Sequence, residues 1–321
     1  MLTIMETSRP TEALTHRALL YGSDDEFLAC TVPFIQDGLD RGDLIRVATT
    51  ACKTGWLRAA LGADAKHVVF WDSRQCFQHP VQALAATHRT MRAAGPDGQR
   101  LRMIGEPMWT ARTRQQRKEW DRYESLVNAA LGWANATLVC TYDTRVVDPE
   151  VVAKVARTHP ELVVSGDPRP SPSYADPAQF NAECDKSPLP ELPPPALWLR
   201  FARVEQLVTL RDFVTSHAST LPRVATARVE QFVLAVNEVA TNVIEHAGEA
   251  GVLQIWTSSE AVLCEVSDTG AGLGDPLAGH LPPDPIVTQG RGLWLARQFC
   301  DLVEMRTGPA GTTVRLHLNL H

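Results

Sequence analysis

The chain has 321 residues, of which 44% are hydrophobic, so it can bury one large core or two ordinary ones, and its length favours two domains. Its net charge of −6 is mild and gives no reason to expect direct binding to nucleic acid or to an anionic membrane. No apolar run approaches the roughly 18 residues that span a bilayer, and the N-terminus is polar, so we expect a soluble cytoplasmic protein. The seven cysteines are dispersed without a CxxC motif, which is typical of reduced thiols. Cys76 and His79 have a spacing that two metal ligands use, but no second pair completes a site.

The first half of the chain alternates short apolar runs with amphipathic stretches. Buried strands are predicted at residues 17–21, 43–48, 68–71, 100–104 and 137–142. Helical spacing occurs at residues 24–41, 54–61, 81–94 and 116–131. This alternation predicts an α/β domain with a mostly parallel sheet covered by helices on both faces, in which ligands bind beyond the carboxyl ends of the strands.

A proline-rich segment separates the two halves. Nine of the 22 prolines fall between Asp167 and Pro195. Proline lacks a backbone N–H and fixes φ, so we expect neither a helix nor a central strand here, but a semi-extended linker. The predicted organisation is an N-terminal tail (1–14), a first domain (15–166), a linker (167–196) and a second domain (197–321).

The second half has a different order of elements. Strands are predicted near residues 197–202, 251–258, 261–267, 302–307 and 312–318, and helices at 204–217, 224–247 and 292–299. A loop rich in glycine and proline fills residues 270–290. Helices and antiparallel strands are segregated, which predicts an α+β sandwich.

The longest predicted helix places a carboxylate and an amide one turn apart. Glu238 and Asn242 are four residues apart, so their side chains project from the same face. The amide oxygen suits Mg²⁺, and the carboxylate can accept a proton from a hydroxyl or a water. Such a pair alone is more typical of a solvated helix face, so its interpretation depends on two later segments.

The first of these segments is Ser267-Asp268-Thr-Gly270-Ala-Gly272-Leu273, directly after an apolar strand. An acid at the strand end can accept the exocyclic amine of a purine, and glycines let the backbone pack against a flat base. A turn with an Asp cap is the alternative interpretation.

The second segment is Gln289-Gly290-Arg291-Gly292-Leu293, which opens a helix. Glycines before a helix N-terminus expose N–H groups to phosphate, and Arg291 adds a positive charge. The segment is not a Walker A loop, because no Gly-Lys-Ser/Thr follows. Finally, Gly311-Thr312-Thr313 enters the last strand, where a hydroxyl can reach toward the base, although strand threonines usually just pack.

In this order and spacing the motifs resemble those of the GHKL (Bergerat-fold) ATPases, and within them the anti-sigma-factor serine/threonine kinases, over about residues 197–321. The resemblance implies an α+β two-layer sandwich that binds ATP and Mg²⁺. It implies that Glu238 is the general base and that Asn242 is the Mg²⁺ ligand. The residues that it implies in nucleotide binding are Asn242, Asp268, Gly270, Gly272, Gly290, Arg291, Gly292, Leu293, Thr312 and Thr313.

Two-component histidine kinases share these nucleotide motifs but need an upstream dimerisation helix with a phosphoacceptor histidine, usually followed by an acid. Here His159 is followed by Pro160 and His217 by Ala218, so neither fits. We therefore expect a protein serine/threonine kinase. An ATP-gated partner-binding module without kinase activity and an atypical sensor histidine kinase stay open as alternatives.

The first domain lacks a phosphate loop. Tyr21-Gly-Ser-Asp-Asp-Glu26 stands at the end of the first strand, where a RecA-type ATPase has that loop, and this acidic run would repel phosphates. The domain resembles the MEDS sensory domain over most of residues 15–175, which implies a degenerate RecA/KaiC-like fold and a ligand- or signal-sensing role. The residues that carry the resemblance are Tyr21, Glu26, Phe34, Gly38, Leu39, Gly42, Asp43, Gly105, Glu106, Trp109, Tyr123, Glu124, Cys140, Tyr142, Asp143, Thr158, His159, Pro160, Ser173 and Tyr174. A small-molecule pocket is predicted at Glu106, Met108, Trp109 and Tyr142, with core packing of the aromatic residues as the alternative.

Together these features predict a bacterial signalling regulator in which a sensory domain is joined to an anti-sigma-type kinase. The expected protein partners are a small anti-sigma-factor antagonist, a sigma factor, or both, with a small-molecule signal at the first domain. The sequence leaves open the identity of these partners, whether the chain forms a homodimer, and whether the sensory domain activates or inhibits the kinase.

Overall fold

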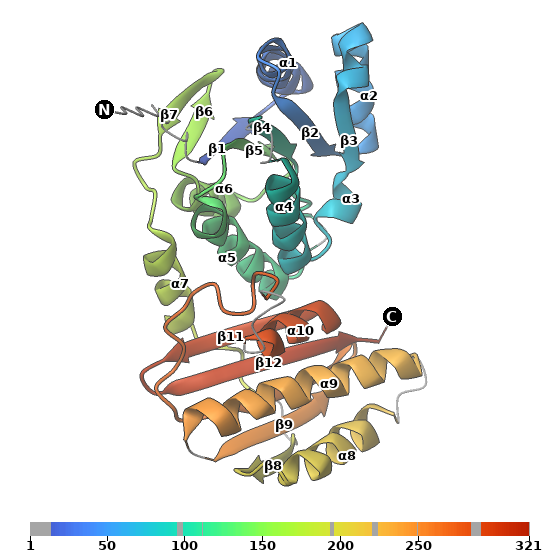
Figure 1. Ribbon diagram of the computed structural model, residues 1–321, viewed down its shortest axis with the longest axis vertical. Helices are drawn as coiled ribbons and strands as arrows, with labels where there is room; N and C mark the ends of the chain where they lie inside the picture. The colour runs from blue at the N-terminus through green and yellow to red at the C-terminus, as the bar shows by residue number, and fades with distance from the viewer. Residues whose placement is uncertain are drawn as a thin grey trace, which may run out of the picture. The chain divides into compact units, whose positions relative to one another are not determined.

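The computed structural model describes residues 14–94, 99–110, 112–192, 196–219, 224–248, 250–283 and 290–320. Contacts between residues divide the chain into two compact units (Figure 1). Unit 1 comprises residues 1–112 and 123–176, and unit 2 comprises residues 113–122 and 177–321. Within the described ranges, no helix combines the length and the apolar character needed to cross a membrane.

Unit 1 is built on a sheet, here called sheet A, with the strand order β3-β2-β4-β5-β1-β6-β7. Its strands are β1 (Thr15–Tyr21), β2 (Leu44–Thr49), β3 (Val68–Asp72), β4 (Leu101–Gly105), β5 (Ala136–Asp143), β6 (Glu161–Val164) and β7 (Asp167–Pro170). Neighbouring strands are parallel except for the antiparallel pair of β6 and β7. The predicted parallel α/β domain is therefore confirmed, and the carboxyl ends of β1, β2, β4 and β5 share one edge of the sheet.

Helices alternate with these strands, as the spacing of apolar residues predicts. They are α1 (Asp24–Asp40), α2 (Ala51–Leu61), a 3₁₀ turn η1 (Gly62–His67), α3 (Ser73–Cys76), α4 (Pro80–Ala94), α5 (Arg114–Leu131) and α6 (Pro149–Thr158). A buried apolar core joins the sheet to α1 and α2, with Phe27 and Ile35 from α1 and Leu57 from α2 packed against Val47 and Ile104. Fully burying a large apolar side chain contributes about 1.5–3 kcal/mol, so such helix faces hold the layers together.

The proline-rich segment is not only the semi-extended linker that we expected, because it contains an edge strand and a helix. Strand β7 lies within it and pairs with β6, with Val163 opposite Pro168 and Glu161 opposite Pro170. Helix α7 (Pro177–Lys186) follows. Proline is tolerated in β7 because that strand is at the sheet edge, and in α7 because Pro177 stands in the first turn, where a backbone N–H has no helical partner.

Unit 2 is built on an antiparallel sheet, here called sheet B, with the strand order β11-β12-β10-β9-β8. Its strands are β8 (Leu197–Phe201), β9 (Gly251–Thr257), β10 (Ala261–Ser267), β11 (Leu302–Gly308) and β12 (Gly311–Asn319). Its helices include α8 (Gln206–Ala218), α9 (Thr226–Asn242), which continues as a π-helical turn η2 (Val243–Ala247), and α10 (Arg291–Phe299). Alternate side chains of β10 and β12, such as Val266 and Val314, pack against these helices in a buried core. The predicted α+β two-layer sandwich is confirmed.

Candidate functional site

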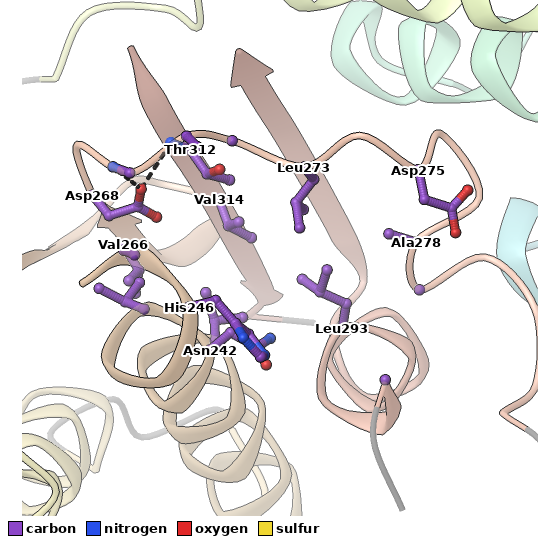
Figure 2. A pocket seen from close by; sticks show the side chains of 18 of the residues that line it. Asn242, His246, Val266, Asp268, Leu273, Asp275, Ala278, Leu293, Thr312 and Val314 are labelled. Atoms are coloured by element: carbon purple, nitrogen blue, oxygen red, sulfur yellow. Dashed lines mark hydrogen bonds between the residues drawn. The ribbon is translucent and has the colours of Figure 1, made fainter. Parts of the chain in front are cut away.

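A cavity of about 480 Å³ opens in unit 2 beside the end of α9. Its walls come from α9 and η2, from the ends of β10 and β12, from the loop after β10 and from the start of α10 (Figure 2). Much of the lining is apolar, including Val239, Val243, Val266, Val314 and Leu293. A concave, largely apolar pocket with a few polar groups is the usual form of a small-molecule site.

Asp268 places a carboxylate on the rim of this cavity. Its Oδ1 accepts hydrogen bonds from the backbone N–H of Gly270 at 2.8 Å and of Thr312 at 3.2 Å. None of the described residues donates a hydrogen bond to Oδ2. Figure 2 shows the two bonds and the second oxygen turned away from them. One carboxylate oxygen thus fixes the side chain, and the other is available to accept a hydrogen bond from a ligand amine.

The glycines after Asp268 are required by close contacts of the backbone. A Cβ on Gly270 would lie 2.9 Å from the Cα of Ala247 at the end of η2. Gly272 has φ +77°, and its Cβ would lie 2.4 Å from the carbonyl oxygen of Gly308. The loop therefore packs closely against η2 and against the β11–β12 turn, and in this position it forms one wall of the cavity.

Glu238 and Asn242 lie on consecutive turns of α9, and the first turn of α10 packs against them. A Cβ on Gly292 would come 3.2 Å from Glu238 Oε2 and 3.3 Å from Asn242 Nδ2. Gly290 is the N-cap of α10 with φ +81°, and it makes no side-chain capping bond. The first N–H groups of α10 therefore point toward the same region as the Glu238–Asn242 face, with the helix dipole favouring an anion there.

The structure places the remaining predicted residues in different positions. Those that line the cavity are Asn242, Asp268, Gly270, Gly272, Gly290, Leu293 and Thr312. Glu238, Arg291 and Gly292 stand beside the lining rather than in it. Thr313 lines a separate depression, because side chains alternate along β12 and the cavity faces Thr312 and Val314. His246, which is exposed, lines the cavity, so it is not a core histidine.

Sequence reasoning missed the apolar wall of the cavity. Val239, Val243 and Ala247 are four residues apart on α9 and η2, and Val266 and Val314 stand two residues from polar cavity residues on their strands. These spacings were available in the sequence. They are also the spacings of ordinary core positions, so only the fold shows which apolar residues remain accessible to a ligand.

The residues predicted for a sensor pocket in unit 1 lie in different environments. The carboxylate of Glu106 is buried, pairs with Lys53 and accepts hydrogen bonds from the hydroxyls of Tyr21 and Thr49. The ring of Trp109 packs against Tyr142 with 6.0 Å between centroids. Burial of the Tyr21 hydroxyl, together with the nearby Glu106 carboxylate, raises the pKa of Tyr21 well above its usual value. Met108 is only partly buried. Ligand binding by these residues stays a prediction.

The N-terminus of α1 carries its own carboxylate. Ser23 Oγ accepts a hydrogen bond from the Glu26 N–H at 3.1 Å, and Glu26 Oε2 accepts one from the Gly22 N–H at 2.7 Å. This pair is a variant of the capping box in which the glutamate reaches the residue before the N-cap, and it satisfies N–H groups that a phosphate loop leaves for its ligand. The acidic run after β1 is therefore a helix cap.

The α+β fold of unit 2 and the motifs around its cavity define a histidine kinase-like ATPase domain, and residues 201–318 match the family model described as the histidine kinase-like ATPase domain. Residues 15–160 match the family model of MEDS, the methanogen/methylotroph, DcmR sensory domain. The chain is thus a MEDS sensory domain followed by a histidine kinase-like ATPase domain, which makes it a sensor-linked signalling protein of the ATPase and kinase class. No curated protein matches the chain as a relative.

Proposed function

We propose that the chain is a sensor-linked protein serine/threonine kinase that binds ATP and Mg²⁺ and phosphorylates a small anti-sigma-factor antagonist protein. The observation that carries the proposal is the Asp268 carboxylate. Its Oδ1 is fixed by two backbone N–H groups, and its Oδ2 faces an apolar cavity large enough for a base. Adenine offers its exocyclic amine at C6 to such an acceptor, whereas guanine has a carbonyl at C6 and carries its amine at C2, so the two purines would have to bind in different orientations.

The residues around the cavity fit a nucleotide and a magnesium ion. Asp268 would accept the adenine amine, and the amide oxygen of Asn242 would coordinate Mg²⁺. The uncapped N–H groups at Gly290 and Gly292 would receive the phosphates. Bound Mg²⁺ supplies neutralisation of phosphate charge during transfer.

Glu238 is the proposed general base. Its carboxylate would accept the proton of the substrate serine or threonine as the hydroxyl oxygen forms a bond to the γ-phosphorus, and the bond from that phosphorus to the β,γ-bridging oxygen would break to release ADP. Its position next to Gly292 puts it at the α10 end of the site, away from the Asp268 end. That separation agrees with one end binding the base and the other handling the phosphates.

Two histidines that precede the nucleotide motifs, His159 and His217, are poor phosphoacceptors. His159 is fully buried, and its Nδ1 contacts the carbonyl oxygen of Val155 at 3.0 Å. His217 belongs to α8 within the ATPase domain, where its Nε2 lies 3.0 Å from Thr257 Oγ1. These contacts support a hydroxyl acceptor on another protein rather than autophosphorylation at either position.

A second candidate function is nucleotide-gated partner capture without transfer, in which the domain holds a sigma factor while ATP is bound. The placement of Glu238 beside the cavity lining favours it, because binding would then not require this residue. In either case a signal at the MEDS domain would regulate the outcome.

The test uses the purified full-length chain, Mg²⁺, γ-labelled ATP and a candidate antagonist protein. We expect transfer to yield acid-stable, alkali-labile phosphate, which is the behaviour of phosphoserine and phosphothreonine. Acid-labile phosphate on the chain itself would instead identify a histidine kinase. Tight ATP binding with no phosphoprotein, but with ATP-dependent retention of a sigma factor, would leave partner capture as the function.

A further inference from the structure

Four side chains of unit 1 converge at a point that the proposed kinase function does not use. They are His16 on β1, Glu124 on α5, Cys140 on β5 and His159 at the C-terminal cap of α6. Their nitrogen, oxygen and sulfur donor atoms all lie within 4.8 Å of one another. We propose that these four residues form a closed, four-coordinate site for a divalent transition-metal ion, with Zn²⁺ as the best-matched ion.

Four of the distances between donor atoms lie at or slightly above those of a tetrahedral site. His16 Nε2 is 3.4 Å from Cys140 Sγ, and Cys140 Sγ is 3.6 Å from Glu124 Oε2. Glu124 Oε2 is 3.8 Å from His16 Nε2 and 3.6 Å from His159 Nε2. Zinc bonds of about 2.0–2.1 Å to nitrogen and about 2.3 Å to sulfur place tetrahedral ligand atoms roughly 3.3–3.6 Å apart.

Hydrogen bonds fix both imidazoles with their Nε2 lone pairs toward the cluster. His159 Nδ1 is 3.0 Å from the carbonyl oxygen of Val155 and 3.1 Å from Thr158 Oγ1, and because the carbonyl can only accept, we assign the proton to Nδ1. His16 Nδ1 is 3.0 Å from Asn128 Oδ1. The amide nitrogen of Asn128 donates to the carbonyl oxygens of Ser125 and Thr158, which orients its oxygen toward His16. An outer hydrogen bond from Nδ1 is the arrangement that metal-binding histidines use.

The chemistry of the donor set selects the class of ion. Two imidazole nitrogens, a thiolate and a carboxylate suit Zn²⁺ and related borderline ions, whereas Ca²⁺ and Mg²⁺ prefer oxygen ligands alone. His16, Glu124 and His159 are each at most 2% exposed and Cys140 is partly buried, so the site would be largely shielded from bulk solvent. The Cys140 thiol contacts His16 Nε2 and Glu124 Oε2, and a bound ion would replace the thiol proton.

The proposed metal site lies next to the predicted sensor pocket, which would couple the ion to sensing. Strands β1 and β5 are adjacent and parallel, with Ala18 opposite Cys140, so His16 and Cys140 project from the same face of sheet A. The ring of Tyr142 lies edge-on to His159, with 5.7 Å between centroids, and its hydroxyl is 3.5 Å from His159 Nε2. Tyr142 is also the partner of Trp109 in the predicted sensor pocket, so a ligand there would act one side chain away from the metal.

The test is a Co²⁺ titration of the full-length protein after treatment with a chelator. We expect one equivalent to bind, with the intense visible absorption of tetrahedral Co²⁺ and a near-ultraviolet thiolate-to-cobalt charge-transfer band, and one equivalent of Zn²⁺ to abolish both. A titration without these bands would overturn the proposal and leave the cluster as a buried hydrogen-bonded network.

Matched variants locate the bound ion. Cys140→Ser should remove the charge-transfer band, while Cys30→Ser, at a partly buried thiol of α1 outside the cluster, should keep it. If Cys140→Ser does not fold, as judged by circular dichroism, Asn128→Ala tests the same site through its outer hydrogen bond and should weaken Co²⁺ binding about 10- to 100-fold. A charge-transfer band unchanged in Cys140→Ser, or a Co²⁺ affinity unchanged in Asn128→Ala, would place the ion elsewhere.

Discussion

The N-termini of α1 and α10 show how one backbone feature is used in two opposite ways. In α1, Ser23 and Glu26 cap the helix, and the first turn carries three acidic residues. In α10, the N-cap is Gly290 with no side-chain bond, and Arg291 follows it. Both helix dipoles attract a negative charge. The sequence of the first turn therefore decides whether that charge is the protein's own carboxylate or comes from a ligand.

The largest effect is expected beside the N-terminus of α10, where the phosphates of ATP would bind. Glu238→Gln removes the proposed base and should lower phosphotransfer about 10²- to 10⁴-fold, because a general base contributes that much to such a step. ATP affinity should change little, since Glu238 lies outside the cavity lining. Single-turnover transfer from labelled ATP and calorimetric titration with ATP measure the two quantities.

The control is Glu230→Gln, an exposed acid two turns earlier on α9. It should leave transfer unchanged. Equal transfer rates in the Glu238→Gln variant and the wild type would remove Glu238 from the mechanism.

The base end of the cavity gives the next largest effect. Asp268→Asn replaces a charged acceptor by an amide, and a hydrogen bond to a charged group is worth about 1.5–3 kcal/mol, so ATP should bind about 10- to 100-fold more weakly. Preference for ATP over GTP should fall as well. Asp275→Asn, at an acid that also lines the cavity, should cost much less. Calorimetric titration with ATP and with GTP measures both affinities. An undiminished preference for ATP in Asp268→Asn would contradict the assignment of Asp268 to adenine binding.

A carboxylate introduced at the N-cap of α10 would give that helix a negative charge at its N-terminus, as α1 has. Gly290 has a left-handed backbone and nothing within 4 Å of a Cβ, so Asp and Asn should be tolerated about equally there. Gly290→Asp should bind ATP about 2- to 30-fold more weakly than Gly290→Asn, because charge near a helix terminus is worth about 0.3–2 kcal/mol. Titrations at low and high salt should show this gap narrowing with salt. Identical affinities would mean that phosphates do not approach this terminus.

The smallest expected effect is a loss of stability at the N-terminus of α1. Ser23→Ala removes the capping hydroxyl and should lower the free energy of unfolding of the sensory domain by about 1 kcal/mol. It should create no new ATP site, because the Glu26 carboxylate stays in place. Urea unfolding and ATP titration of the same variant check both statements. A second bound ATP would show that the α1 terminus can also receive a phosphate.

Local patterns were sufficient for most of the secondary structure. The predicted strands and helices of both domains match the observed ones within a few residues, because apolar spacing is a property of neighbouring positions. The main errors fell after residue 143: α6 and β6 were not predicted, and the proline-rich segment contains β7 and α7. Composition averaged over 29 residues hid the proline-free stretch after Pro177 that forms α7.

The ATPase-type site can be predicted from the sequence because its motifs are short. Asn242 follows Glu238 by one helical turn, and Gly270 and Gly272 follow Asp268 within four residues, so these groupings are visible without the fold. Which of Thr312 and Thr313 lines the cavity became visible only in the fold, because it depends on which face of β12 meets the cavity.

Only the tertiary structure assembled the proposed metal site. The one local spacing suited to a metal was Cys76 and His79, yet the four clustered donors are spread from His16 to His159. Parallel strands such as β1 and β5 are adjacent in space but separated by more than a hundred residues. A ligand set drawn from them leaves no short motif, since its geometry exists only after the crossover helices have packed.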